Sequence, residues 1–238
     1  MEFFVPPDES DQWYEYWCNE RLNWYIEHGI PAEMVMLRPH DADELSHYST
    51  GTSDVEFKFP WGFDELEGIA KRTDFDLKAH AAASGEKLDY FDPQSNERYV
   101  PYVIEPAAGA TRAMAAFLLA AYDEDEVNGE SRTVLRLHPR LAPYKVAVLP
   151  LSKKDTLTPL AHEVRKLLAD RYMVDYDETQ NIGKRYRRQD EIGTPLAVTV
   201  DFESLDDNAV TVRDRDTMEQ VRVPIEELLA TVSGKLGF

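Results

Sequence analysis

The sequence of 238 residues has one cysteine and no long hydrophobic run. The single Cys18 excludes a disulfide framework and a multi-cysteine zinc site, and it suits a reducing compartment. The longest apolar stretch, residues 113–122, is about half the length of a membrane-spanning helix. The first residues lack the basic and apolar regions of a signal peptide. We therefore expect a cytoplasmic protein with no membrane partner.

Basic residues are scarce, because 26 Lys and Arg stand against 45 Asp and Glu, for a net charge of -19. This balance argues against indiscriminate nucleic-acid binding, which needs a basic surface. The acidity is uneven, with 28 acids and 12 bases in residues 1–143 but 17 and 14 in residues 144–238. At 43% hydrophobic and 11% aromatic, the chain has enough apolar material for a packed core, which excludes disorder throughout.

The change in charge coincides with a polar, turn-rich stretch at residues 123–130, followed by Pro139 and Pro143. Such stretches are typical of domain boundaries. We predict a first domain at 1–130, a linker at 131–143 and a second domain at 144–238.

Local patterns in the first part predict an α+β domain with an antiparallel sheet. Ser10 or Asp11 is the expected cap of the first helix. The alternation of polar and apolar residues at 54–59 is typical of a half-buried strand. The expected elements are a helix at 10–28, strands at 54–59 and 99–105, and a small-residue helix at 110–122.

The second part predicts a three-layer α/β domain with a mixed five-stranded sheet. Its β-α-β-α-β order followed by a hairpin and a helix places parallel strands beside an antiparallel pair. Pro224 suits the first position of the last helix. The expected strands are 144–149, 172–176, 196–200, 208–213 and 220–223, and the expected helices are 158–171, 182–192 and 225–232.

The junction between a strand and a helix at residues 103–112 is the first candidate site. Gly109 permits a ligand to approach the backbone, and the helix N-terminus offers N–H groups to an anion. Arg112 lies in the first turn, where it can reach a phosphate, and Glu105 ends the strand. From the residues alone, an ordinary buried helix with a paired arginine is the favoured alternative.

Residues 61–76 form a second candidate, with five carboxylates and two bases among aromatic side chains. Such a cluster suits Mg²⁺ and a small charged substrate. A solvated surface turn with weak ion pairs explains the same pattern.

The third candidate is the basic segment 183–191, with four bases in the five residues 184–188 and an interleaved Tyr186. Arginine grips phosphates and tyrosine stacks on bases, so single-stranded RNA is one ligand that fits. A solvated basic helix face fits equally well. The histidines have no metal-ligand spacing, and no nucleophile elbow, P-loop or Rossmann motif is present.

Several of these segments together, in order, resemble the C-terminal half of glycyl-tRNA synthetases of the dimeric class II type. Residues 1–6 resemble the second strand of motif 2, and residues 105–112 resemble motif 3. The remaining similar segments are the family blocks at 47–60 and 65–77 and the anticodon-binding segments at 183–195 and 208–215.

The resemblance implies a glycine–tRNA ligase, in which glycine and ATP form glycyl-adenylate with Mg²⁺ before the glycyl group passes to tRNA(Gly). It also implies a homodimeric full-length enzyme. The fold implied is a partial class II catalytic core with an antiparallel sheet, followed by an α/β anticodon-binding domain.

The resemblance also implies roles for individual residues. Arg112 and Glu105 are the expected catalytic residues, and Glu65 the expected Mg²⁺ ligand. The expected ATP-binding residues are Glu65, Leu66, Gly109, Ala110, Thr111 and Arg112. The expected glycine-binding residues are Arg72, Glu105, Pro106, Ala107, Ala108 and Gly109. The expected tRNA-binding residues are Lys184, Arg185, Arg187 and Arg188.

Two departures from the family pattern bear on activity. Ala107 stands where many members of the family have a serine, and motif 1 with most of motif 2 is missing from this sequence. We therefore expect that the chain alone does not form adenylate and that residues 1–130 alone are poorly stable. The alternative function is a non-catalytic tRNA-binding module that acts through residues 144–238.

Overall fold

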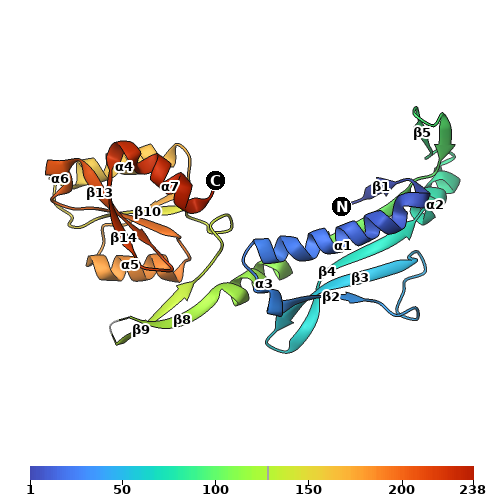
Figure 1. The fold of residues 1–238 in the computed structure, drawn as a ribbon, viewed down its shortest axis with the longest axis horizontal. Coiled ribbons are helices and arrows are strands. Elements are labelled where there is room, and N and C mark those ends of the chain that lie inside the picture. Colours follow the sequence, from blue (N-terminus) through green and yellow to red (C-terminus); the bar gives the residue numbers. More distant parts are fainter. Residues whose placement is uncertain (128) are drawn as a thin grey trace. The chain divides into compact units, whose positions relative to one another are not determined.

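The computed structural model describes residues 1–127 and 129–238, which form two compact units, Met1–Ala120 and Ala121–Phe238 (Figure 1). Among these residues, no helix combines the length and the apolar character needed to cross a membrane. The elements that begin in the first unit are β1 (Phe3–Val5), η1 (Pro7–Glu9), α1 (Ser10–Glu27), η2 (Ala32–Met34), β2 (Val35–Pro39), β3 (Gly51–Phe59), β4 (Gly62–Thr73), α2 (Phe75–Ser84), β5 (Tyr90–Asp92), β6 (Glu97–Tyr99), β7 (Tyr102–Ala108) and α3 (Ala110–Ala121).

The first unit is built on an antiparallel sheet with the strand order β1-β7-β4-β3-β2. Helix α1 lies along one face of this sheet (Figure 1). Tyr25 of α1 is fully buried and donates a hydrogen bond to Glu67 of β4 at 2.8 Å. Residues Ser53 and Glu67 therefore belong to the helix-covered face, and the residues that alternate with them lie on the opposite face.

Two local expectations in this unit are wrong. No side chain caps α1, because the 3₁₀ turn η1 runs directly into it and the Ser10 hydroxyl donates instead to the carbonyl of Pro7 at 2.9 Å. The alternative of a surface turn for residues 61–76 also fails. Most of that segment is the long central strand β4, since Leu66 and Ile69 anchor it in the core.

The second unit contains a hairpin followed by an α/β domain. Its sheet has the order β11-β10-β12-β13-β14, with β10 parallel to both neighbours and β13 antiparallel to both of its own. Its elements are β8 (Tyr122–Val127), β9 (Glu130–Leu135), β10 (Val146–Pro150), α4 (Thr158–Ala169), β11 (Val174–Tyr176), α5 (Ile182–Glu191), β12 (Leu196–Val200), α6 (Ser204–Asp207), β13 (Ala209–Asp214), β14 (Gln220–Pro224), η3 (Ile225–Glu227) and α7 (Leu228–Leu236).

Successive residues of β10 pack against different layers. Val146 and Val148 belong to an apolar cluster with helices α4 and α7, whereas Ala147 and Leu149 pack with Ile182 of α5. Helices therefore cover both faces of the mixed five-stranded sheet, and the predicted fold class is confirmed for both units.

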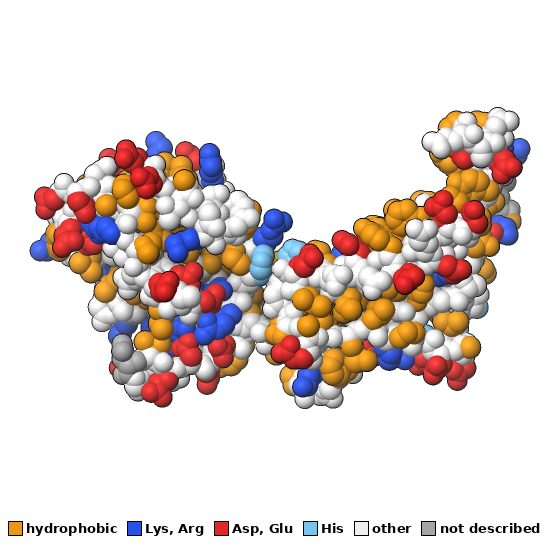
Figure 2. Space-filling view, viewed as in Figure 1, with side chains coloured by type: hydrophobic (Ala, Val, Ile, Leu, Met, Phe, Trp, Pro, Cys, Tyr) orange, Lys and Arg blue, Asp and Glu red, His pale blue; other side chains and the backbone are white. Residues whose placement is uncertain are grey.

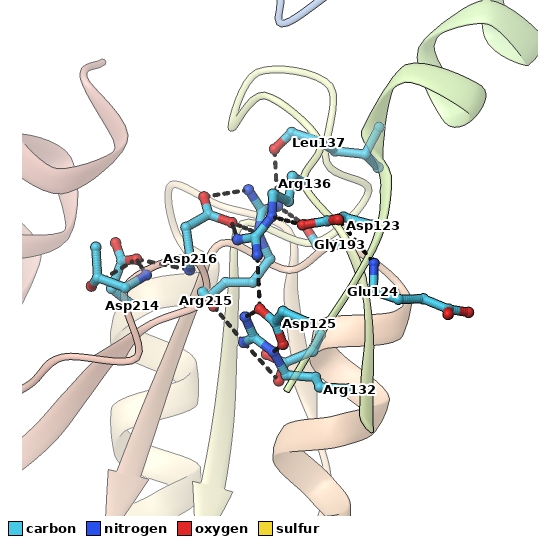
Figure 3. A network of polar contacts seen from close by, with 12 residues as sticks. Asp123, Glu124, Asp125, Arg132, Arg136, Leu137, Gly193, Asp214, Arg215 and Asp216 are labelled. Atoms are coloured by element: carbon cyan, nitrogen blue, oxygen red, sulfur yellow. Dashed lines mark hydrogen bonds and ion pairs between the residues drawn. The ribbon is translucent and has the colours of Figure 1, made fainter. Parts of the chain in front are cut away.

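The turn-rich stretch at 123–130 contains instead most of β8 and the first residue of β9, which pair as a two-stranded hairpin within the second unit. Arg132 of β9 is completely buried and donates hydrogen bonds to Asp125, to Asp190 at 3.4 Å and to the carbonyl of Arg215 at 2.8 Å (Figure 3). Because these bonds join the hairpin to α5 and to the β13–β14 turn, the compact units divide at Ala120, before the expected end of the first domain.

Candidate functional site

The face of the first sheet opposite α1 carries the small residues Gly68, Ala70 and Ala107, which we call the floor. Two rows of paired residues cross β3, β4 and β7 on that face. A methyl group added to Gly68 would meet carboxylate oxygens of Asp54 and Glu65 at 3.5 and 3.7 Å, so acidic groups surround this floor. The rows are Thr52–Ala70–Glu105 and Asp54–Gly68–Ala107.

Above this floor lies a cavity of about 240 Å³. It brings together Glu65, Glu105 and Ala107, three of the residues predicted from the sequence. The loop between β2 and β3 supplies a wall that we did not predict, formed by His40, Glu44, Ser46 and Tyr48.

His40 in this wall is held by Asp54, whose carboxylate lies 2.7 Å from its Nε2 atom and is almost fully buried. Because an ionised carboxylate only accepts hydrogen bonds, Nε2 of His40 carries the proton. This pair fixes the imidazole at the edge of the cavity.

Arg72 and Glu105, the predicted partners of a zwitterion, are in direct contact. Nη1 of Arg72 donates to Glu105 at 2.6 Å, and Nε and Nη2 donate to Asp76 at 2.7 and 3.2 Å. The hydrogen bond from Arg72 holds the pKa of Asp76 below its usual range. Arg72 is the extra residue of a β-bulge between β4 and β7, a feature that re-aims a side chain.

Arg112 lies in the first turn of α3, as predicted, and reaches back to β4. It pairs with Asp64 at 2.8 Å, donates to the carbonyl of Glu65 and lies 4.7 Å from the ring centre of Phe59. The indole of Trp61 and the Arg112 guanidinium together lower the pKa of Asp64. The predicted ATP-binding residues Glu65 and Arg112 are thus neighbours.

The junction predicted to bind ATP and glycine is exposed from Ala107 to Arg112, ahead of and into α3. Two of the other predicted residues have buried side chains. Leu66 is 2% exposed, and Pro106 pairs with Ile69 on the helix-covered face. Their side chains do not reach the cavity, so only the backbone of Leu66 and Pro106 is available to a ligand.

Glu65 is the carboxylate that the sequence predicts as the Mg²⁺ ligand, and it lines the cavity together with Glu44, Asp54 and Glu105. Within residues 1–127 and 129–238, no group of three or more His, Cys, Asp or Glu side chains is arranged to hold a metal ion. In nucleotide sites Mg²⁺ is commonly held by one or two carboxylates together with substrate phosphates.

The basic helix α5 of the second unit corrects the predicted RNA-binding set. Arg185 is 2% exposed, and its guanidinium donates to the carbonyls of Pro150, Thr179 and Gln180. It joins the end of β10 to the loop after β11, so its side chain is not available to RNA. Arg188 is paired with Asp177.

Lys184 and Arg187 remain at the surface of α5, and neither has an ion pair or a hydrogen bond from its side chain within the described part of the chain. Arg187 borders a cavity of about 460 Å³ with Tyr186 and Arg213. Arg213 lies 4.8 Å from the ring centre of Tyr186. On the face of this unit seen in Figure 2, basic side chains are interspersed with acidic ones. The cavity brings two arginines and a tyrosine ring together.

The comparisons with known proteins agree with this architecture. Residues 145–235 match the family model described as "Anticodon binding domain". A solved prolyl-tRNA synthetase from Cryptosporidium parvum, complexed with halofuginone and AMPPNP, has a similar fold with a TM-score of 0.72. That likeness covers 99% of this chain and 46% of the synthetase at 18% sequence identity, and it therefore concerns the fold alone.

Curated relatives named glycine–tRNA ligase are similar along the whole chain. Those of Macrococcus caseolyticus and Geobacillus kaustophilus are 58% and 56% identical over 100% of it, and that of Corynebacterium glutamicum is 56% identical over 99%. The chain spans about half the length of these relatives, at 51%, 52% and 53%. The chain thus carries an anticodon-binding domain and corresponds along its length to about half of a glycine–tRNA ligase.

Proposed function

We propose that this chain supplies part of the catalytic site and the tRNA-binding domain of a glycine–tRNA ligase. The observation that carries the proposal is the cavity in which Glu65 and Glu105 meet above a floor of small residues, in a chain 55–58% identical to such ligases. The reaction would join glycine to ATP as glycyl-adenylate and then transfer glycine to tRNA(Gly). A homodimeric full-length enzyme and a cytoplasmic location belong to the same proposal.

The Arg72–Glu105 pair suits glycine because each side chain occupies the position that the oppositely charged partner's ligand group would take. Arg72 stands in for the ammonium beside Glu105, and Glu105 stands in for the carboxylate beside Arg72. A bound glycine would place its ammonium at Glu105 and its carboxylate at Arg72, exchanging one ion pair for two. Only a ligand with both charges can offset the free energy lost when the 2.6 Å contact between Arg72 and Glu105 opens. The small floor leaves room for the ligand but contributes no hydroxyl at Ala107.

ATP would lie beside the β4–α3 contact. Arg112, held by Asp64 near the ring of Phe59, would bind phosphate and flank the adenine. The backbone of Leu66 and of residues 109–111 would complete the nucleotide site. Mg²⁺ would be held by Glu65 and the phosphates and would neutralise charge during adenylyl transfer.

Glycine-dependent exchange between ATP and pyrophosphate tests this function. We would measure it for the chain alone and with the remaining half of the Geobacillus kaustophilus relative added in trans. We expect exchange only in the mixture, with Glu105→Gln and Arg112→Gln each reducing it by about 100-fold or more. Exchange that does not depend on glycine, or that survives Glu105→Gln, would reject the assignment.

A non-catalytic tRNA-binding module is the second candidate function, favoured by the match at 145–235 and by the cavity at Tyr186 and Arg187. Both functions predict binding of tRNA(Gly), and only the ligase predicts exchange activity. Binding of tRNA(Gly) by the chain, with no exchange in the mixture, would favour the module.

A further inference from the structure

Arg72 has three kinds of neighbour, and each uses a different part of its guanidinium. Asp76 accepts from Nε and Nη2 along one edge, while Glu105 accepts from Nη1. The ring of Tyr48 covers a face, with its centre 4.0 Å from the Cζ atom. The side chain of Arg72 is 18% exposed, so these three contacts define its position.

The elements that provide Tyr48 and Asp76 are anchored to each other without Arg72. His47, next to Tyr48, packs edge-on against Phe75 of α2 at 5.3 Å between ring centres. The Ser49 hydroxyl donates to the carbonyl of Gly51 at 2.8 Å, which ties the same loop to β3. Tyr48 and Asp76 therefore stay in place if Arg72 loses its other partner.

Glu105 borders the cavity, as Tyr48 does, but it is the only one of the three neighbours that combines this position with an ionic contact, which it makes to Arg72 through one nitrogen. Asp76 holds Arg72 through two nitrogens, which fixes the orientation of the guanidinium plane. The contact with Glu105 is consequently the one that a ligand can replace.

We propose that Tyr48 and Asp76 are positioning residues that hold Arg72 in place while its contact with Glu105 is exchanged for the carboxylate of a small zwitterion. This inference rests on the proposed function for the identity of the ligand. It adds Tyr48 and Asp76 to the residues on which glycine binding depends.

Side-chain NMR of the whole 238-residue chain tests the positioning. The Nε–H signal of Arg72, assigned by its loss in Arg72→Lys, reports rotation of the guanidinium. We expect Tyr48→Leu to speed this rotation by about tenfold, and Tyr48→Phe, which keeps the ring, to change it less than about twofold. Asp76→Asn should also speed it. Phe91→Leu, which removes the ring beside Arg98, is the matched control and should have no effect on Arg72.

Unchanged rotation in both Tyr48→Leu and Asp76→Asn overturns the proposal. A separate titration with glycine shows whether the Nε–H signal of Arg72 changes position. It also shows whether Tyr48→Leu raises the glycine concentration needed for half of that change by about tenfold. If glycine leaves Arg72 unchanged in the unaltered chain, the proposed ligand is wrong, while the rotation rates still decide whether Tyr48 and Asp76 position the arginine.

Discussion

The two units each contain a cluster of arginines and carboxylates, and the clusters differ in burial. In the first unit the side chains of Arg72 and Glu105 are 18% and 25% exposed beside a cavity. In the second, Arg132 and Asp190 are 0% and 1% exposed, and Arg213 joins Asp190 through two hydrogen bonds. The same side-chain chemistry can thus offer exchangeable contacts to a ligand or lock a fold, and access to water decides which.

The largest expected effect is that of Asp190→Ala. It would leave Arg132 and Arg213 buried with one carboxylate fewer, and we expect a loss of about 3–5 kcal/mol in the free energy of unfolding. Urea denaturation of residues 121–238 would measure it. A loss below 1 kcal/mol would mean that this buried cluster resembles the exposed one.

Removing the hairpin should have the next largest effect. Residues 144–238 should still fold, because both faces of their sheet keep their helices. They should be less stable than residues 121–238 by about 2–3 kcal/mol, since the contacts of Arg132 and the Leu137 cluster are lost. Equal urea midpoints for the two pieces would place the hairpin outside the cooperative unit.

Acid should weaken the second unit through Asp125. The hydrogen bond from Arg132 lowers the pKa of Asp125 in the folded state. The ionised Asp125 carboxylate therefore contributes its full stabilisation of the folded state above the ordinary aspartate pKa of about 3.9. This stabilisation is lost as the pH falls from there through the pKa of Asp125 in the folded state. Asp125→Asn should give a shallower decline in urea midpoint between pH 5 and pH 2, and an unchanged decline would exclude this carboxyl as a source.

Arg187→Ala should weaken tRNA binding without affecting folding. We expect an affinity about three- to tenfold lower and a salt dependence reduced by about one phosphate contact. Arg188→Ala should have a smaller effect on binding, because Asp177 already pairs with it. Arg165→Ala on α4, across the sheet, is the control. Equal effects of Arg165→Ala and Arg187→Ala would reject the cavity as the binding site.

The smallest expected change in stability is that of Glu105→Gln. Because the Arg72–Glu105 pair is partly exposed, its removal should alter the free energy of unfolding by less than about 1 kcal/mol. Glycine-dependent exchange between ATP and pyrophosphate should nevertheless be lost. A destabilisation as large as that of Asp190→Ala would remove the distinction between the two clusters.

Sequence patterns predicted most of the helices and strands of the second domain, because segments such as 196–200 are apolar at all positions but Thr199 and are buried along their whole length. The hairpin was missed because β8 is a run of acids, Asp123 to Glu126, whose inward members meet Arg132 and Arg136 instead of an apolar core. A hydrophobic pattern does not register such a strand.

Sequence patterns placed some of the predicted site residues correctly and others incorrectly. Glu65, Glu105 and Ala107 come together because neighbouring strands carry them on one face. Arg185 was expected at the surface with its basic neighbours, yet it is buried by the loop after β11. Which of four adjacent bases faces inward depends on distant carbonyls, and a local charge pattern contains no information on their position.

The floor of Gly68, Ala70 and Ala107 has a consequence for the evolution of this protein. Gly68 has an ordinary backbone conformation, and an added methyl group would make only normal contacts there. A single-step change from glycine can therefore reduce the volume of the cavity while every charged group around it stays in place. The size of the ligand that fits can change by steric substitution alone, independently of the charged groups that we propose bind a zwitterion.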